Sequence, residues 1–511
     1  MNDAESLIAV SAGGWWSRAE YHEQEVDDYK ENPLLEALPP IRSSKELARG
    51  LRYRPSYNEA DRHLAPEIRQ HITEKVLSFI QPLTIHVDLA HRISRLIRNG
   101  YIMRNPVLPR YRTDMEEGLD ALIRRVPRHG PRATGMLIAG ISGAGKTTGL
   151  EAVLDMYPQV VEHSEYRGRP FPFTQVVYLR LECPADSSVR GLCLSYFNAI
   201  DDLLGTRYRD RYVRFKTTVD MLLSTMARIS AVHGLGVLVV DEIQCLASAK
   251  SGGEKVMLNF FSQLVNTIGV PVVLVGTPGA VEVVTREFRH ARRGTGQGDL
   301  IWDRMRRDTD DGDAEWRLFC DSLWRYQYVQ HPSPITPKLY DVLYEESQGI
   351  TDVVVKLYML AQHRAIQTGT ERITGGLIRA VAQDSLRAIR RVLQALRDGK
   401  QGEHFLASLD DVLAEGLEQI VATGIRATDR LGTNVQRKAS QPVHDPATVS
   451  DQPPTPVPPK APPRTARVRR SAQPLPDATL MDLVEAGKAA MVSPYEALYQ
   501  AGLIVVDGVV A

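Results

Sequence analysis

The sequence predicts an α/β fold, in which helices flank a parallel β-sheet, with a small helical lid domain after it and an N-terminal helical extension before it. Short apolar or alternating runs with strand character recur along the chain, at 135–139, 174–182, 235–240 and 270–276. Helical patterns separate these runs, and strands that alternate with helices form a parallel sheet. From about residue 315 the pattern is helical only, over 337–347, 350–366 and 374–395.

The first 110 residues are predicted to be an N-terminal extension with a helical module. Residues 1–60 look irregular, and the pair Trp15-Trp16 is interpreted as a local packing anchor in preference to a partner-binding peptide. Two helices are expected at about 64–80 and 84–99, because their apolar residues recur at helical spacing. We expect this module to pack in front of the sheet domain.

The remaining chain divides by composition into five segments. Residues 111–315 hold the α/β domain, 316–400 the lid domain and 401–440 a helical extension. Residues 441–477 are rich in proline and arginine, which predicts an extended, basic linker. The segment 478–511 regains a helical apolar pattern, and it is either a tethered docking segment or a minor lid element reached by a long loop.

Composition bounds the class of protein. A chain of 511 residues with 43% hydrophobic residues can hold two to four folded domains. No apolar run approaches the ~18 residues of a membrane span, and the N-terminus lacks a signal pattern. Four scattered cysteines favour reduced thiols in a cytoplasmic protein over a disulfide frame or a zinc site. Because 62 basic residues balance 62 acidic ones, any nucleic-acid signal must be local.

The most informative motif is the run 140–148, which matches G-x-x-x-x-G-K-[ST] between a predicted strand and a predicted helix. Its glycines let successive backbone N–H groups point at an anion, and the helix N-terminus faces the same anion. Lys146 would reach the β- and γ-phosphates of ATP, and the Thr147 hydroxyl would hold Mg²⁺. The predicted nucleotide-binding residues are Gly140, Ser142, Gly143, Ala144, Gly145, Lys146, Thr147 and Thr148.

A second motif follows the apolar run 237–240, where Asp241 and Glu242 are delivered at the end of a buried strand. Asp241 is predicted to bind Mg²⁺ through water, and Glu242 to act as the general base that polarises the attacking water. Thr277 follows the next strand, where it would either orient the lytic water or cap the turn.

Two further sets of basic residues extend the predicted site. Arg289, Arg292 and Arg293 lie downstream of the last strand, and one of them is predicted to reach a neighbouring subunit's γ-phosphate; contact with DNA is the alternative. Lys356 lies one turn into a lid helix, where it would either sense the γ-phosphate or be an exposed lysine.

Contact with DNA is predicted from one of two segments, without a choice between them. The run 207–216 interleaves aromatic residues with Arg207, Arg209, Arg211, Arg214 and Lys216. A solvated helix face is the alternative interpretation. The loop after the acidic pair holds Lys250 and Lys255. Neither segment indicates base readout, so binding should depend on salt and little on sequence.

The order of these elements resembles the AAA+ ATPases, and several stretches resemble one branch, the TnsC-type (TniB-related) transposition regulators of Tn-seven-like transposons. The runs 140–148 and 240–244 are general to ATPases. The runs that resemble the branch itself are 181–188, 197–208, 288–298 and 347–356.

The resemblance implies an ATP-dependent protein that oligomerises as a ring or filament on double-stranded target DNA. It further implies that the protein links a target-selection protein to transposase subunits and is reset by ATP hydrolysis. A replication initiator or helicase loader, a signalling ATPase switch without a DNA role, and an inactive nucleotide-bound scaffold are the alternatives.

Overall fold

The computed structural model describes residues 8–9, 15–109, 135–184, 188–214, 216–248, 258–259, 261–262, 265, 269–279, 298–398 and 412–428. At its centre is a five-stranded sheet of order β6-β7-β8-β3-β9 in which every pairing is parallel. Its strands are β3 (Gly135–Ala139), β6 (Tyr178–Glu182), β7 (Val237–Asp241), β8 (Val272–Gly276) and β9 (Leu300–Ile301). The predicted α/β fold with a parallel sheet is confirmed.

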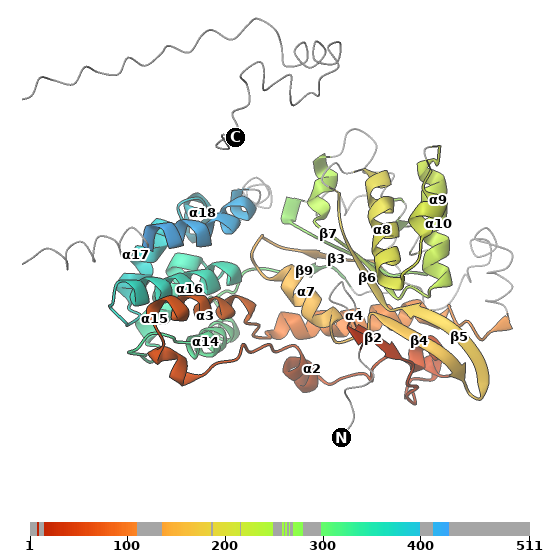
Figure 1. Ribbon diagram of the computed structural model, residues 1–511, viewed down its shortest axis with the longest axis horizontal. Coiled ribbons are helices and arrows are strands. Elements are labelled where there is room, and N and C mark those ends of the chain that lie inside the picture. The colour runs from red at the N-terminus through yellow and green to blue at the C-terminus, as the bar shows by residue number, and fades with distance from the viewer. Residues whose placement is uncertain are drawn as a thin grey trace, which may run out of the picture. The chain divides into compact units, whose positions relative to one another are not determined.

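The apolar runs of β3, β7 and β8 are buried along their whole length because helices cover both faces of the sheet (Figure 1). Alternate residues of β3 enter two different cores, as the pleat of a strand requires. Met136 and Ile138 join one core with α4 (Thr84–Ile102) and α7 (Lys146–Leu154). Leu137 and Ala139 join the other with α8 (Val189–Leu204) and α10 (Val219–Val232).

A second sheet of order β1-β2-β4-β5 was not predicted. It contains β1 (Ile8–Ala9), β2 (Trp15–Arg18), β4 (Val160–Tyr166) and β5 (Arg169–Val176). β2 runs parallel to β4, so the Trp15-Trp16 pair is a strand, and the Trp15 indole N–H donates to Asp155 O at 3.3 Å. The packing-anchor interpretation therefore agrees with the described contacts.

The single strand predicted over 174–182 is in fact two strands that belong to different sheets. The chain leaves β5 at Val176 and enters β6 at Tyr178. Val177 joins them, because its N–H donates to Gln159 O while its carbonyl accepts from Val237 N of the central sheet. Residues 174–182 contain no turn signal between the two strands, so the sequence pattern alone does not show the change of sheet.

The helical region after the sheet is built around α16 (Thr351–Gln367), which is buried along most of its length. The predicted helix 374–395 is broken, and the side chains of Arg387 and Arg390 donate to the carbonyl of Gln383 near the end of its first part. The helices that accompany α16 are α14 (Asp310–Trp324), α15 (Pro337–Ser347), α17 (Gly375–Ser385), α18 (Arg390–Arg397) and a helix over 412–428.

The predicted N-terminal module does not pack as one unit in front of the sheet. Its first helix, α3 (Pro66–Thr73), packs against α16, whereas α4 covers the central sheet (Figure 1). The remaining described elements are η1 (Asp27–Tyr29), α1 (Pro33–Glu36), α2 (Ser44–Gly50), η2 (Glu59–His63), η3 (Glu74–Ser78), α9 (Tyr208–Tyr212) and η4 (Ile243–Ser248). None of the described helices combines the length and the apolar character needed to cross a membrane.

A buried ion pair fixes α3 to the lid. The fully buried Arg69 guanidinium donates to both carboxylate oxygens of Glu371, at 2.8 and 2.7 Å, and to the carbonyls of Leu64 and Tyr328. Burial alone would raise the pKa of Glu371, but its bonds with Arg69 lower it below the ordinary value. The pair therefore contributes stability that is present at neutral pH and is lost as pH falls through the lowered pKa of Glu371.

Replacing Arg69 with Met should lower the free energy of unfolding of the lid by about 3–5 kcal/mol, because Glu371 keeps its charge without a partner. Urea unfolding followed by tryptophan fluorescence would measure this decrease, since Trp316 and Trp324 of α14 are buried in the lid. The exposed Arg49 replaced by Met is the control, and a change below about 1 kcal/mol in Arg69→Met would contradict the role assigned to the pair.

Candidate functional site

The loop between β3 and α7 has the geometry of a phosphate-binding loop. Gly143 and Gly145 adopt left-handed backbone conformations, with φ of 77° and 97°, which glycine adopts without strain. A Cβ on Gly140 would lie 1.9 Å from the carbonyl oxygen of Trp302, so no other residue fits there. The buried Lys146 ammonium donates to Gly140 O at 2.7 Å and Ile141 O at 3.0 Å. The loop therefore curls around the lysine at the N-terminus of α7.

The two predicted metal ligands meet at the C-terminal edge of the sheet. The Thr147 hydroxyl donates to Asp241 Oδ2 at 3.0 Å, and Asp241 Oδ1 accepts the backbone N–H of Glu242 at 2.9 Å. Hydroxyl and carboxylate oxygens are the hard ligands that Mg²⁺ prefers. The donor set on the described residues thus fits the predicted metal.

The predicted general base and the predicted water-orienting residue lie at the same edge. Glu242 is exposed just beyond β7 and has φ of 58°, a conformation that turns the chain sharply after Asp241. Its carboxylate accepts the side-chain amide of Gln244. Thr277 directly follows β8 and is buried. Both residues line the same cavity as Lys146, and their catalytic roles stay predictions.

Arg180 also contacts the predicted metal ligand Asp241, and the sequence analysis did not select this arginine. The residues Thr147, Arg180, Asp241 and Glu242 are called the catalytic cluster below. Arg180 lies on β6 and donates to Asp241 Oδ2 at 3.2 Å and to the Glu151 carboxylate of α7. The signal in the sequence was weak, because one arginine between Leu179 and Leu181 also fits the solvent side of an alternating strand.

The lid rests directly on the phosphate-binding loop. The Thr351 hydroxyl donates to Ala144 O at 3.3 Å, and the backbone N–H of Asp352 donates to Gly143 O at 3.0 Å. Lys356 lines the cavity, where its ammonium pairs with Asp352 at 2.7 Å and donates to Leu417 O at 2.9 Å. Burial raises the pKa of Asp352, and Lys356 opposes this change. Lys356 is therefore not a free surface lysine, and its contact with the γ-phosphate stays a prediction.

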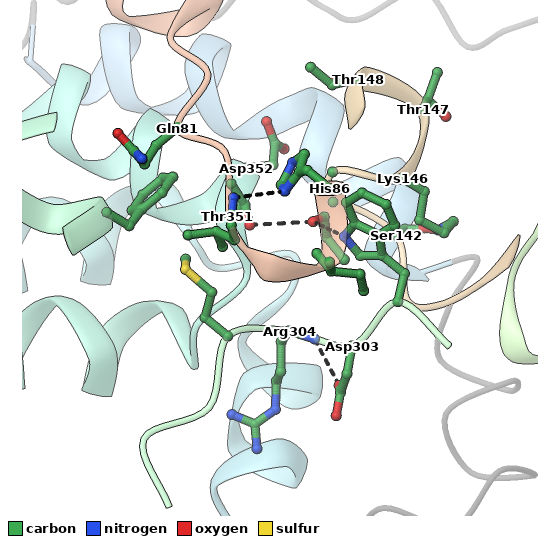
Figure 2. Close-up of a pocket in the computed structure, with 18 of the residues that line it drawn as sticks. Gln81, His86, Ser142, Lys146, Thr147, Thr148, Asp303, Arg304, Thr351 and Asp352 are labelled. Carbon is green, nitrogen blue, oxygen red and sulfur yellow. Dashed lines mark hydrogen bonds between the residues drawn. The ribbon is translucent and has the colours of Figure 1, made fainter. Parts of the chain in front are cut away.

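A cavity of about 1140 Å³ lies in front of these groups, which is ample for a nucleoside triphosphate. Figure 2 labels the loop residues Ser142, Lys146, Thr147 and Thr148 among the residues that line it, together with the lid residues Thr351 and Asp352. The segment 77–86 also lines it, a contribution that sequence analysis missed. His86 accepts the N–H of Leu83 through Nδ1, and burial lowers its pKa to about 4. It is therefore neutral at neutral pH.

Comparison with known families agrees with this geometry. Residues 131–284, which include the phosphate-binding loop and Asp241-Glu242, match the family model described as an AAA domain. The chain carries an AAA-type ATPase domain. No curated protein was found that matches the sequence.

Solved structures similar to this ATPase share little sequence with it. The ORC1 protein of Aeropyrum pernix in complex with DNA is 17% identical, covers 58% of this chain and 70% of its own, and has a TM-score of 0.35. The ORC2 protein of the same organism, in complexes with ADPNP and ADP, is 13% identical, covers 68% and 98%, and has a TM-score of 0.34. The Cdc6p protein of Pyrobaculum aerophilum is 11% identical, covers 66% and 97%, and has a TM-score of 0.35.

The ATPase exposes one of the two predicted DNA-binding segments. Arg207, Arg209, Arg211, Arg214 and Lys216 are all exposed on and around α9, and none lines the nucleotide cavity. Tyr208 and Tyr212 stack with ring centroids 6.1 Å apart, and the Arg211 guanidinium lies 5.4 Å from the Tyr212 ring. The other predicted DNA residues, Lys250 and Lys255, and the predicted finger residues Arg289, Arg292 and Arg293 lie outside the described residues.

Proposed function

We propose that this ATPase is an ATP-dependent, DNA-binding regulator of transposition. It oligomerises on target DNA, couples a target-selection protein to the transposase, and is reset when it hydrolyses ATP. The ATPase domain and its nucleotide cavity support the dependence on ATP. The role in transposition is supported by a resemblance to TnsC-type regulators, which is found in the runs 181–188, 197–208, 288–298 and 347–356.

In this proposal the chain's own residues divide the work at the cavity. The backbone N–H groups of the loop and the Lys146 ammonium hold the phosphates. Thr147 and Asp241 would hold Mg²⁺, which neutralises charge on the phosphate oxygens. Glu242 takes a proton from the attacking water, and Thr277 orients that water.

The lid and a neighbouring subunit complete the site. Lys356 exchanges its bonds with Asp352 and Leu417 for the γ-phosphate, which ties lid position to nucleotide state. One of Arg289, Arg292 and Arg293 reaches the ATP of the adjacent subunit, so that ATP favours the assembled state. Hydrolysis then weakens the interface between subunits and releases the oligomer from DNA.

The observation that carries the DNA part is the exposed group of five cations at 207–216 with its stacked tyrosines. Cations neutralise phosphates without reading bases, and the Arg211 guanidinium lies 5.4 Å from the Tyr212 ring, which holds this arginine close to the surface. A regulator that must act at many target sites needs this kind of sequence-independent contact.

Electron microscopy of the protein with duplex DNA, with and without a non-hydrolysable ATP analogue, tests the proposal in one experiment. We expect rings or filaments around DNA with the analogue and dispersed protein without it. Assembly that ignores DNA would favour a signalling ATPase. DNA-bound assemblies that fail to stimulate a transposase in a separate strand-transfer assay would favour a replication initiator or helicase loader.

Reversing the charge of Arg207, Arg209 and Arg211 to Glu should weaken duplex DNA binding at least about tenfold at physiological salt. The slope of log affinity against log salt should also fall by about 0.9 for each phosphate that the variant no longer neutralises. Fluorescence anisotropy over a salt series measures both quantities.

The matched control reverses Arg49, Arg52 and Arg54, three exposed arginines with the same total charge change. If both triple variants lose the same affinity, only net charge matters and the segment 207–216 does not touch DNA. If neither loses affinity, the DNA-binding surface lies elsewhere on the chain.

A further inference from the structure

The carboxylate of Asp241 is almost completely buried, with 3% of its side chain exposed. Its Oδ1 accepts the Glu242 N–H, while its Oδ2 accepts both the Thr147 hydroxyl at 3.0 Å and the Arg180 guanidinium at 3.2 Å. A buried carboxylate without a countercharge is strongly destabilising. Arg180 therefore supplies the positive charge that Asp241 needs in this structure.

Arg180 holds a second carboxylate as well. Its other terminal nitrogen pairs with Glu151 of α7, and Glu151 is about half exposed. Strand β6 lies beside β7 in register, with Arg180 opposite Val239 and Glu182 opposite Asp241. The guanidinium thus bridges a buried carboxylate in the catalytic cluster and a more exposed one beside it.

The carboxylate oxygen that Arg180 contacts is also the oxygen that faces the Thr147 hydroxyl. Thr147 and Asp241 are the residues that would hold Mg²⁺, Asp241 through a water, so the hydrated cation and the guanidinium compete for the same oxygen. Two positive charges a few Å apart repel each other more strongly inside a protein than in water, because the dielectric constant is lower there. When the metal binds, Arg180 can release Asp241 and still keep a carboxylate partner, because it is already bonded to Glu151.

We propose that Arg180 is a positioning residue that occupies Asp241 Oδ2 when the metal is absent and withdraws to Glu151 when the metal binds. The inference rests on the metal-holding roles of Thr147 and Asp241, and it needs neither DNA nor transposase. The metal affinity of the ATPase then depends on how strongly Arg180 binds Asp241 relative to Glu151. Arg180→Met removes the competitor, whereas Glu151→Gln leaves Arg180 with Asp241 alone. The two variants should therefore shift metal affinity in opposite directions.

The test titrates Mn²⁺ into the full-length protein with bound ADP and follows free Mn²⁺ by electron paramagnetic resonance. We expect Arg180→Met to lower the dissociation constant for Mn²⁺ about fivefold, and Glu151→Gln to raise it by a similar factor, equivalent to about 1 kcal/mol each. Arg180→Lys keeps the charge and should stay near the wild type. The dissociation constant for ADP in EDTA should be the same in all variants, because nothing competes there.

Opposite shifts support the proposal, since general damage to the fold would weaken metal binding in both variants. Shifts in the same direction, or weaker Mn²⁺ binding in Arg180→Met, would overturn it. If Arg180→Met does not fold, Glu151→Gln decides alone: unchanged or tighter Mn²⁺ binding contradicts the competition. A wild-type complex that binds no Mn²⁺ would instead disprove the metal site itself, and neither result depends on DNA binding.

Discussion

Replacing Lys146 with Ala should abolish nucleotide binding, with the dissociation constant for ATP rising at least about 100-fold. Charge-assisted hydrogen bonds contribute about 1.5–3 kcal/mol each, and the lysine would make such bonds to two phosphate groups. Its ammonium is already positioned by the carbonyls of Gly140 and Ile141, so little ordering cost offsets the gain. Titration with a fluorescent ATP analogue measures the change in affinity.

Lys338→Ala is the control, because Lys338 is an exposed lysine of the lid that does not line the nucleotide cavity. Lys146→Ala should also fail to accumulate on DNA, since ATP is needed for assembly in the proposed function. ATP affinity within about threefold of the wild type would show that the loop does not bind phosphates through this lysine.

The parts of the site that sequence analysis found are those that lie within one continuous stretch of chain. The local sequence is enough to predict the conformation of the loop at 140–148 and of the strand that ends in Asp241-Glu242. The pattern of apolar runs likewise predicted the parallel sheet and four of its five strands, β3, β6, β7 and β8, whereas the two-residue strand β9 was not predicted. Local spacing decides these features, so one sequence is sufficient to predict them.

The features that were missed depend on packing between distant residues. β2 pairs with β4 across more than 140 positions, and a pattern within either strand does not reveal its partner. Arg180 reaches Asp241 because β6 and β7 are neighbours, and the segment 77–86 lines a cavity whose other residues are far from it in the sequence. Long-range packing determines where these residues lie, and the periodicity of apolar residues in the sequence does not predict it.

Replacing Glu242 with Gln should leave ATP binding within about threefold of the wild type and reduce hydrolysis by roughly 10²–10⁴. Gln has the shape of Glu but does not accept a proton from water at neutral pH. Glu242 is exposed at the cavity, and its left-handed backbone conformation separates its position from that of buried Asp241. The substitution therefore removes the base while keeping the groups that hold phosphates and metal.

The neighbouring carboxylate Glu182 provides a matched control, since it is exposed at the end of β6 and stands opposite Asp241 in the sheet. Glu182→Gln should hydrolyse ATP at the wild-type rate, which release of phosphate under single-turnover conditions measures. If Glu242→Gln also turns over normally, the general base lies elsewhere and the catalytic assignment is wrong.

The same variant separates assembly from reset. If ATP binding builds the oligomer and hydrolysis dismantles it, Glu242→Gln with ATP should remain on duplex DNA while the wild type dissociates as its ATP is consumed. Rapid dissociation of a variant that binds ATP and does not hydrolyse it would mean that hydrolysis is not the reset. Nucleotide exchange or a partner protein would then control how long the assembly stays on DNA.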